Sequence, residues 1–346
     1  METIENNQPL ALQHNEGLVI STYDFGLGKE EAQELDPNEP HPNFIESNTN
    51  AISLEDLTTK CIVPTFADMS LTISHQSGIA CICKAAESIW GELTPVEIRV
   101  SHPIHGRTHD ALYLKESELK PEQKTLFYQR MAFIAHVKGM TRNICGQEVM
   151  LTIGATRSYH EDKLYGRKSP MKWQLFCDWA VRCCSNQLVL AGYGGTVECL
   201  TEADLYQQAY LLFSRFAHNQ EDELHTLENL NNTVLPEDVL CSIWGRLRLY
   251  QFLSTEQKAD LPEVILGDQI INNSVKQYCS NPNFGKKPGE EITCWNLAQY
   301  LTEGVKAGSY IDRFAERMQN ALTFSIGIQK ALAGDPAGLA YRWFLQ

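Results

Sequence analysis

Four stretches in the first two thirds of the chain alternate apolar and polar residues with the period of two that a half-buried β-strand requires. In the clearest of them, residues 173–183, every second side chain from Trp173 to Cys183 is apolar or a thiol. The other three span residues 96–102, 126–137 and 149–159. The pattern therefore predicts four strands over these ranges.

The short link between the second and third predicted strands, residues 142–147, contains Asn143 and Gly146. These residue types favour tight turns, so we predict a hairpin here. Such regular alternation is typical of antiparallel sheets. We expect an antiparallel sheet of about four to five strands with one face covered and the other open to water or a partner.

Helical periodicity precedes and follows the predicted strands. Ser53 begins a capping pattern ahead of a short helix, and apolar residues recur at helical spacing over residues 74–90. After the strands, Thr201 and Pro236 each open a helix, and further helical patterns cover residues 268–278, 294–301 and 310–332, with loops at 281–290 and 334–338. Strands followed by helices indicate the α+β class.

The chain divides into three predicted parts. Residues 1–45 lack clustered apolar positions and are expected to form a disordered acidic tail. Residues 46–200 form the α+β sheet domain, and residues 201–346 form a helical region packed on it. Because an unpacked tail removes no buried area when it is cut away, truncation before Asn48 is expected to leave the melting temperature unchanged.

The formal net charge of −14 is unevenly distributed. Residues 1–56 carry a net charge of −11, whereas residues 96–190 carry +5. This asymmetry indicates an anionic partner for the middle of the chain or a tail that masks it. A tail that only aids solubility explains the charge equally well.

Eleven cysteines are present, and no pair has the Cys-x-x-Cys spacing of zinc ribbons and thioredoxin-like sites. Reduced, mostly buried thiols are the simplest interpretation. The chain shows no signal-peptide pattern and no apolar run of the roughly 18 residues that a membrane span needs. We expect a soluble, cytoplasmic protein without membrane contact.

The stretch from Arg99 to Asp110 contains three histidines, His102, His105 and His109, near an aspartate. Imidazoles at this spacing could surround a divalent metal. However, Pro103 and Gly106 place a turn among them, so the sequence favours a polar turn and no metal or other cofactor.

Sequence motifs for catalysis are missing. There is no Gly-x-Ser-x-Gly, phosphate loop or His-Glu-x-x-His motif. Tyr159 or Tyr165 beside Arg157 and His160 would suit a DNA-nicking tyrosine, but the chain lacks the histidine cluster that polarises the phosphate in such enzymes. The sequence thus favours a non-catalytic protein.

Each predicted strand contains an arginine, and the loop after the third adds cations and tyrosines. Arginines on a sheet face with interleaved aromatic residues are suited to binding single strands. Cross-strand ion pairs on a solvated face are the alternative. Arg157 shares the apolar face of its strand, so it reaches a ligand only if a bulge or strand end intervenes. The candidate nucleic-acid contacts are Arg99, Arg107, Arg130, Arg157, Tyr159, Tyr165, Arg167, Lys168 and Arg182.

Several motifs carry a family resemblance. They are E-S-N-T at 46–49, R-V-S-H-P-I-H-G-R at 99–107, Y-Q-R-M-A-F-I-A at 128–135, L-T-I-G-A-T-R-S-Y at 151–159, G-R-L-R-L-Y-Q-F-L at 245–253, S-Y-I-D-R-F at 309–314 and the closing W-F-L. These stretches resemble an uncharacterised bacterial family, number 3871 among the domains of unknown function, encoded largely on conjugative and plasmid-like elements. The family pattern includes His102 and Arg107 but not His105 or His109. The resemblance implies a mobile-element context and no particular chemistry.

Two hypotheses follow. The first is a non-catalytic accessory protein of mobile elements that binds or anneals single-stranded DNA on an oligomeric sheet surface; the order of its elements resembles single-strand annealing proteins in outline. The second is a protein-binding inhibitor that uses its acidic segment as a DNA mimic against a host defence enzyme. The basic middle favours the first and the acidic segment the second.

Overall fold

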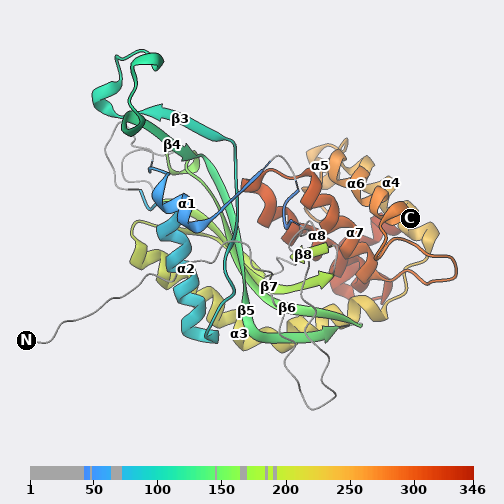
Figure 1. Ribbon diagram of the computed structural model, residues 1–346. Helices are drawn as coiled ribbons and strands as arrows, with labels where there is room; N and C mark the ends of the chain where they lie inside the picture. The colour runs from blue at the N-terminus through green and yellow to red at the C-terminus, as the bar shows by residue number, and fades with distance from the viewer. Residues whose placement is uncertain are drawn as a thin grey trace, which may run out of the picture. The chain divides into compact units, whose positions relative to one another are not determined.

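The computed structural model describes residues 43–46, 49–63, 72–144, 146–163, 170–183, 186–189 and 193–346. Asn43–Gln346 form one unit. Its centre is an antiparallel sheet with helices on both faces, and most of the helices come from the second half of the chain (Figure 1). The fold is α+β, as predicted.

Six strands follow one another across the main sheet in the order β1, β2, β5, β6, β7 and β8, and β9 also pairs with β7. The prediction of four to five strands is therefore wrong. The short strands β1 and β8 cannot show a clear alternation, and β9 contains two adjacent glycines that resemble a turn. The strand bounds are β1 Asn50–Ile52, β2 Glu97–Val100, β5 Arg130–Ile144, β6 Gln147–Ser158, β7 Met171–Cys183, β8 Asn186–Val189 and β9 Tyr193–Cys199.

The predicted hairpin joins β5 to β6. Ile144 pairs with Gln147 in the antiparallel register, which confirms the turn at residues 142–147. Gly146 has a φ of +75°, in the left-handed region that glycine adopts without strain. Its N–H donates to the Asn143 side-chain oxygen at 3.0 Å. Asn143 and Gly146 thus fix the turn in the way their residue types suggested.

One face of the main sheet carries the apolar positions of the predicted strands. Leu151 and Ile153 on β6 share this face with Trp173 and Trp179 on β7, and all four are buried. Helices α2 (His75–Trp90) and α3 (Glu202–Asn232) cover the face. A Cβ added to Gly78 would lie 1.9 Å from the Trp173 ring, so α2 can pack this closely only because residue 78 lacks a side chain.

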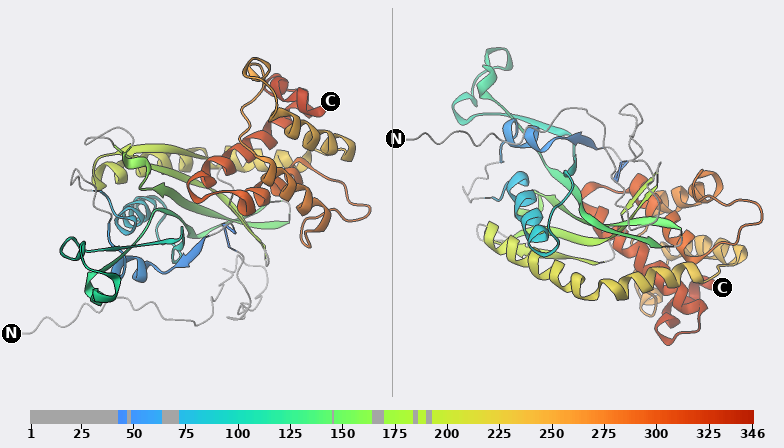
Figure 2. Two further views of the ribbon diagram at one scale, coloured as in Figure 1. Left: turned by 90° about the horizontal axis from the view of Figure 1, so that it is seen from above. Right: turned by 60° about the horizontal axis from the view of Figure 1, so that its bottom comes forward.

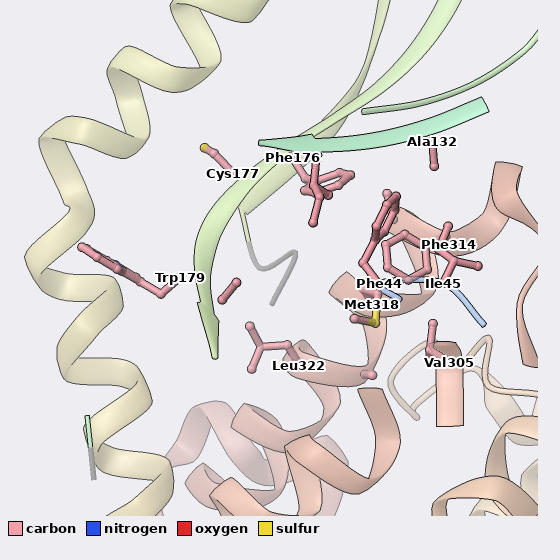
Figure 3. Packing of buried hydrophobic residues seen from close by; sticks show 14 of the residues in the cluster. Phe44, Ile45, Ala132, Phe176, Cys177, Trp179, Val305, Phe314, Met318 and Leu322 are labelled. Carbon is pink, nitrogen blue, oxygen red and sulfur yellow. The ribbon is translucent and has the colours of Figure 1, made fainter. Parts of the chain in front are cut away.

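The opposite face is covered as well. Phe176 on β7 contacts Phe314, the first residue of α8 (Phe314–Leu332), with ring centroids 6.5 Å apart. Phe44 packs on Phe314 with a centroid distance of 5.9 Å. Figure 3 shows Phe176 directed toward Phe44 and Phe314, whereas Trp179 extends to the other side of the strand. The expectation of a face open to water or a partner is therefore wrong.

Two helices begin at the capping residues that the sequence indicates, whereas the helix predicted over residues 310–332 begins at Phe314. Thr201 Oγ1 accepts from the Asp204 N–H at 3.1 Å at the start of α3, and Ser53 Oγ accepts from the Asp56 N–H at 3.0 Å at the start of α1. The predicted loop at 334–338 ends earlier, because Pro336 opens a 3-10 helix. The bounds are α1 Leu54–Thr59, α4 Glu237–Tyr250, α5 Thr255–Lys258, α6 Asp268–Ser280, α7 Cys294–Gly308, η5 Ile311–Arg313 and η6 Pro336–Leu345.

A single apolar core runs from the sheet into the helical region. It includes Phe44 and Ile45, which are 1% and 0% exposed. The sequence interpretation placed both in the disordered tail, whereas the structure places them between the sheet and the C-terminal helices. Truncation before Asn48 would remove these two buried side chains, so the expectation that it leaves the melting temperature unchanged is wrong. Residues 1–42 of that predicted tail lie outside the described residues.

Two further properties concern the described residues as a group. None of their helices combines the length and hydropathy needed to cross a lipid bilayer. Their cysteine side chains are free thiols: Cys61, Cys81, Cys83, Cys177, Cys199, Cys241, Cys279 and Cys294.

Candidate nucleic-acid interface

Strands β3 (Pro103–Arg107) and β4 (Lys124–Tyr128) form a two-stranded ribbon separate from the main sheet. Figures 1 and 2 show this ribbon extending away from the strands and helices around the core. We call residues 102–129 the arm. At its base, the Ser101 N–H donates to the Arg130 carbonyl at 3.0 Å, which joins the two chain segments where they leave the main sheet.

Three 3-10 helices connect the ribbon strands: η1 (His109–Ala111), η2 (Glu116–Glu118) and η3 (Pro121–Gln123). The Thr108 N–H donates to the Gln123 carbonyl at 3.0 Å and closes the connection. Arg107 Nη1 donates to the Leu114 carbonyl. Of the arm residues, all of which the structure describes, Ala111 alone is buried. The arm is thus ordered by hydrogen bonds within it and by the Ile62 N–H, which donates to the Leu126 carbonyl at 2.9 Å, and it adds little to the core.

Cations of the arm are available to an anionic ligand. Lys115, Lys120 and Lys124 are exposed, and none forms an ion pair with a carboxylate among the described residues. Two carboxylates of the arm accept hydrogen bonds from other arm residues. Glu118 accepts from the Lys115 N–H at 3.2 Å, and Asp110 accepts from the Gln123 side chain at 3.1 Å.

These hydrogen bonds also affect the acidity of Asp110. Donors on the side chains of Thr108 and Gln123 hold the pKa of the Asp110 carboxyl below its usual value. Asp110 therefore stays ionised and bound to its own turn. With neutral histidines the formal charge of the arm is zero, so attraction of an anion depends on the positions of the unpaired lysines.

The three histidines of the opening motif also lie on the arm. His102, His105 and His109 are all exposed. Across the ranges that the structure describes, no group of three or more His, Cys, Asp and Glu side chains is arranged to hold a metal ion. Pro103 and Gly106 occupy the ribbon strand β3, paired with Tyr128 and Thr125, instead of the expected turn.

Apolar side chains are exposed on the arm too. Tyr113, between η1 and η2, is 97% exposed, and its neighbour Leu112 is 51% exposed. Ile104 on β3 is 40% exposed. The arm thus exposes a ring and two aliphatic side chains as well as unpaired lysines, a combination suited to a ligand that is both charged and aromatic.

Arg157 and Tyr159, two predicted contact residues, lie in a buried cluster at the base of the arm. The Arg157 guanidinium pairs with Asp162 at 2.7 Å and donates to the Ile73 carbonyl. It contacts the rings of Tyr159 and Trp173, with its central carbon 4.7 and 4.5 Å from the two centroids. We call Arg157, Tyr159, Asp162, Trp173 and His75 the root cluster. Arg157 is 2% exposed. Its guanidinium therefore pairs with Asp162 inside the fold and does not face a ligand in solution.

Contacts of the root cluster hold the end of β4. The His75 ring stacks on Tyr159 with centroids 4.1 Å apart. His75 Nε2 lies 2.9 Å from the Tyr128 carbonyl, an acceptor, so Nε2 carries the proton. The Tyr159 N–H donates to the Gln129 carbonyl at 3.0 Å. The cluster therefore positions the two residues through which the arm returns to the main sheet.

Burial controls protonation in the root cluster. It lowers the pKa of His75 to about 3, with a further contribution from the Arg157 charge. It raises the pKa of Tyr159 to about 12. Burial also raises the pKa of the Asp162 carboxyl, and the Arg157 guanidinium opposes that rise. His75 and Tyr159 are therefore neutral at pH 7, as a packed structural cluster requires.

The other predicted residues are dispersed. Arg99 is half-buried and donates to the Ile45 carbonyl at 3.3 Å, and Arg130 pairs with Asp312 at 3.2 Å, both on the face that Phe44 and α8 cover. Of the predicted set, Arg107 lies on the exposed arm. The side chain of Arg182 lies outside the described residues, as do Tyr165, Arg167 and Lys168.

The sequence interpretation did not single out the lysines of the arm or Tyr113. Residues 108–123 follow neither the strand period nor the helix period, so no element was assigned to them. The available signal was the spacing of Lys115, Lys120 and Lys124 around Pro121 in a segment with few apolar residues.

Comparison with protein families gives one match. The family model described as a domain of unknown function, "B. Theta Gene description" (DUF3871), matches residues 31–345. The chain belongs to this family. No curated protein matches the chain, and no solved structure does. The DUF3871 match covers both the sheet and the helical region, so the arm and its root cluster lie within the family domain.

Proposed function

We propose that this DUF3871 protein is a non-catalytic accessory protein of mobile genetic elements that acts in the cytoplasm and binds single-stranded nucleic acid through the arm. The observation that carries the proposal is that one arm bears three exposed, unpaired lysines, Lys115, Lys120 and Lys124, and the 97%-exposed ring of Tyr113. Cations hold phosphates and rings stack on bases in proteins that bind single strands.

The arm replaces the sheet face as the proposed contact surface. Helices cover both faces of the main sheet, and the guanidinium groups of Arg99, Arg130 and Arg157 have partners inside the fold. Arg107 stays in the proposed set because it lies on β3 of the arm. Tyr165, Arg167, Lys168 and Arg182 stay in it as predictions from the sequence.

The test is fluorescence anisotropy of a labelled oligothymidine at several salt concentrations. Each phosphate contact contributes about 0.7 to the log–log salt slope for single strands. Replacing Lys115, Lys120 and Lys124 together with Ala should therefore flatten the slope by about 2. The control replaces three lysines outside the arm, Lys84, Lys276 and Lys330, which changes the net charge equally. It should leave the slope nearly unchanged.

Equal slopes for the arm and control variants would show that the lysines of the arm do not contact phosphates. No binding of the wild type at low salt would remove nucleic acid as the ligand. The second candidate function would then lead, namely a protein-binding inhibitor that mimics DNA. The net charge of −11 over residues 1–56 favours that function.

A further inference from the structure

Tyr113 is held in place by ordered backbone on both sides although its ring is in water. The Ala111 N–H donates to the Thr108 carbonyl at 3.0 Å, and the Leu114 N–H donates to the Ala111 carbonyl at 3.1 Å. Arg107 donates to the Leu114 carbonyl from the ribbon. Ala111 is also fully buried. The backbone that carries Tyr113 is therefore held in one conformation by hydrogen bonds and packing, although the Tyr113 side chain is exposed.

The turn that carries Tyr113 also carries cations and a second apolar side chain. Arg107 reaches the turn through Leu114, and Lys115 follows two residues after Tyr113. Leu112, 51% exposed, precedes it. Tyr113 itself has no ring or hydrogen-bond contact within the described part of the chain. An exposed aromatic ring with no contact of its own, on a turn that also carries Arg107 and Lys115, is available to a nucleobase whose neighbouring phosphates meet the cations.

We propose that Tyr113 stacks on an unpaired base and thereby makes the arm selective for single strands over duplexes. This inference rests on the proposed nucleic-acid function and names the residue that determines selectivity. In a duplex the base faces are already stacked on each other, so the ring gains nothing there without separating the strands. The lysines contact phosphates of either form and give affinity without this selectivity.

The experiment compares wild type, Tyr113→Ala and Tyr113→Phe on three labelled ligands of equal length. These are a single strand, a duplex and a single strand with abasic sites throughout its centre. Stacking of one base on a ring is worth a roughly 5- to 150-fold change in affinity on alanine substitution. We expect Tyr113→Ala to lose that factor on the single strand, to match wild type on the duplex and abasic strand, and to keep the salt slope.

Tyr113→Phe retains the ring and should bind as wild type does. Tyr310→Ala is the matched control, because Tyr310 is 71% exposed on a different element. Equal affinity of wild type and Tyr113→Ala for the single strand would overturn the inference while leaving the phosphate contacts of the lysines intact. A loss of affinity that is equal on all three ligands would also overturn it. Absence of any binding by the wild type would instead remove the proposed function itself.

Discussion

Arg157 shows at the scale of single residues how a predicted ligand contact serves the fold. Its guanidinium lies between the rings of Tyr159 and Trp173 and pairs with a carboxylate that is 4% exposed. In the interior, where the dielectric constant is low, each charge of a buried ion pair compensates the other, and removing one leaves the other buried without a partner. The alternation of β6 places Arg157 on the apolar face, so the sequence did contain the signal for its burial.

Replacing Arg157 with Ala should lower the free energy of unfolding by about 3–5 kcal/mol, because Asp162 would remain buried without its partner. Urea denaturation measures the change. The control is Lys138→Ala, which breaks an exposed ion pair with Glu92 of 2.9 Å and should cost no more than about 1 kcal/mol. Equal losses for the two variants would contradict the structural role of the root cluster.

His75 predicts a pH dependence with a definite sign. Its pKa is about 3 in the folded protein, below the ordinary value of 6.5, so the unfolded chain binds a proton that the folded chain refuses. Stability should therefore fall as the pH drops from 6.5 toward 3, by at most about 1.4 kcal/mol per pH unit from this group. The raised pKa of Asp162 acts in the opposite direction.

A His75→Gln variant isolates the contribution of the histidine, because Asp162 is present in both proteins. Urea midpoints at pH 7 and pH 5 should differ less for the variant than for the wild type. Parallel pH profiles would show that His75 is not held neutral in the fold.

At the scale of elements, local signals located most of the longer helices and were insufficient for several strands. Ser53 and Thr201 cap the helices they were expected to cap, since a cap depends on a few neighbouring residues. β9 depends on a distant partner: a Cβ on Gly194 would lie 2.7 Å from the Leu175 carbonyl, a contact that its own neighbours in the sequence do not reveal. The arm was missed because residues 108–123 follow neither the strand period nor the helix period.

The end of the arm can be removed at little cost to the fold. His105 pairs with Leu126, so an Asn-Gly turn can join them in place of residues 106–125 and close a shorter ribbon. This change removes one buried side chain, that of Ala111. It keeps the Tyr128 and Gln129 carbonyls that the root cluster contacts. We call this variant the short-arm protein.

At the scale of the whole molecule, the point at which the chain is truncated determines how much of the core is retained. Phe44 and Ile45 are buried between the sheet and the C-terminal helices. The Glu46 N–H donates to the Lys306 carbonyl at 3.1 Å, and its carboxylate lies 3.8 Å from the buried Lys306 ammonium. Composition alone assigned these residues to the tail, because two apolar side chains in a polar segment show no periodicity.

A chain that starts at Asn43 should therefore be more stable than one that starts at Thr49. Loss of a buried phenylalanine and a buried isoleucine predicts a difference of at least about 3 kcal/mol in the free energy of unfolding. Denaturation of the two purified proteins side by side measures it. Identical midpoints would show that Phe44 and Ile45 do not belong to the core.

The most direct test of the arm as a nucleic-acid interface is one anisotropy titration, performed at low salt with labelled oligothymidine on the wild type and the short-arm protein. The free energy of unfolding of the short-arm protein should lie within about 1 kcal/mol of the wild-type value, since only one buried alanine is lost. It should bind the oligonucleotide at least tenfold more weakly, because Lys115, Lys120, Lys124 and Tyr113 are all removed. A folded short-arm protein that binds with the affinity of the wild type would contradict the proposed role of the arm.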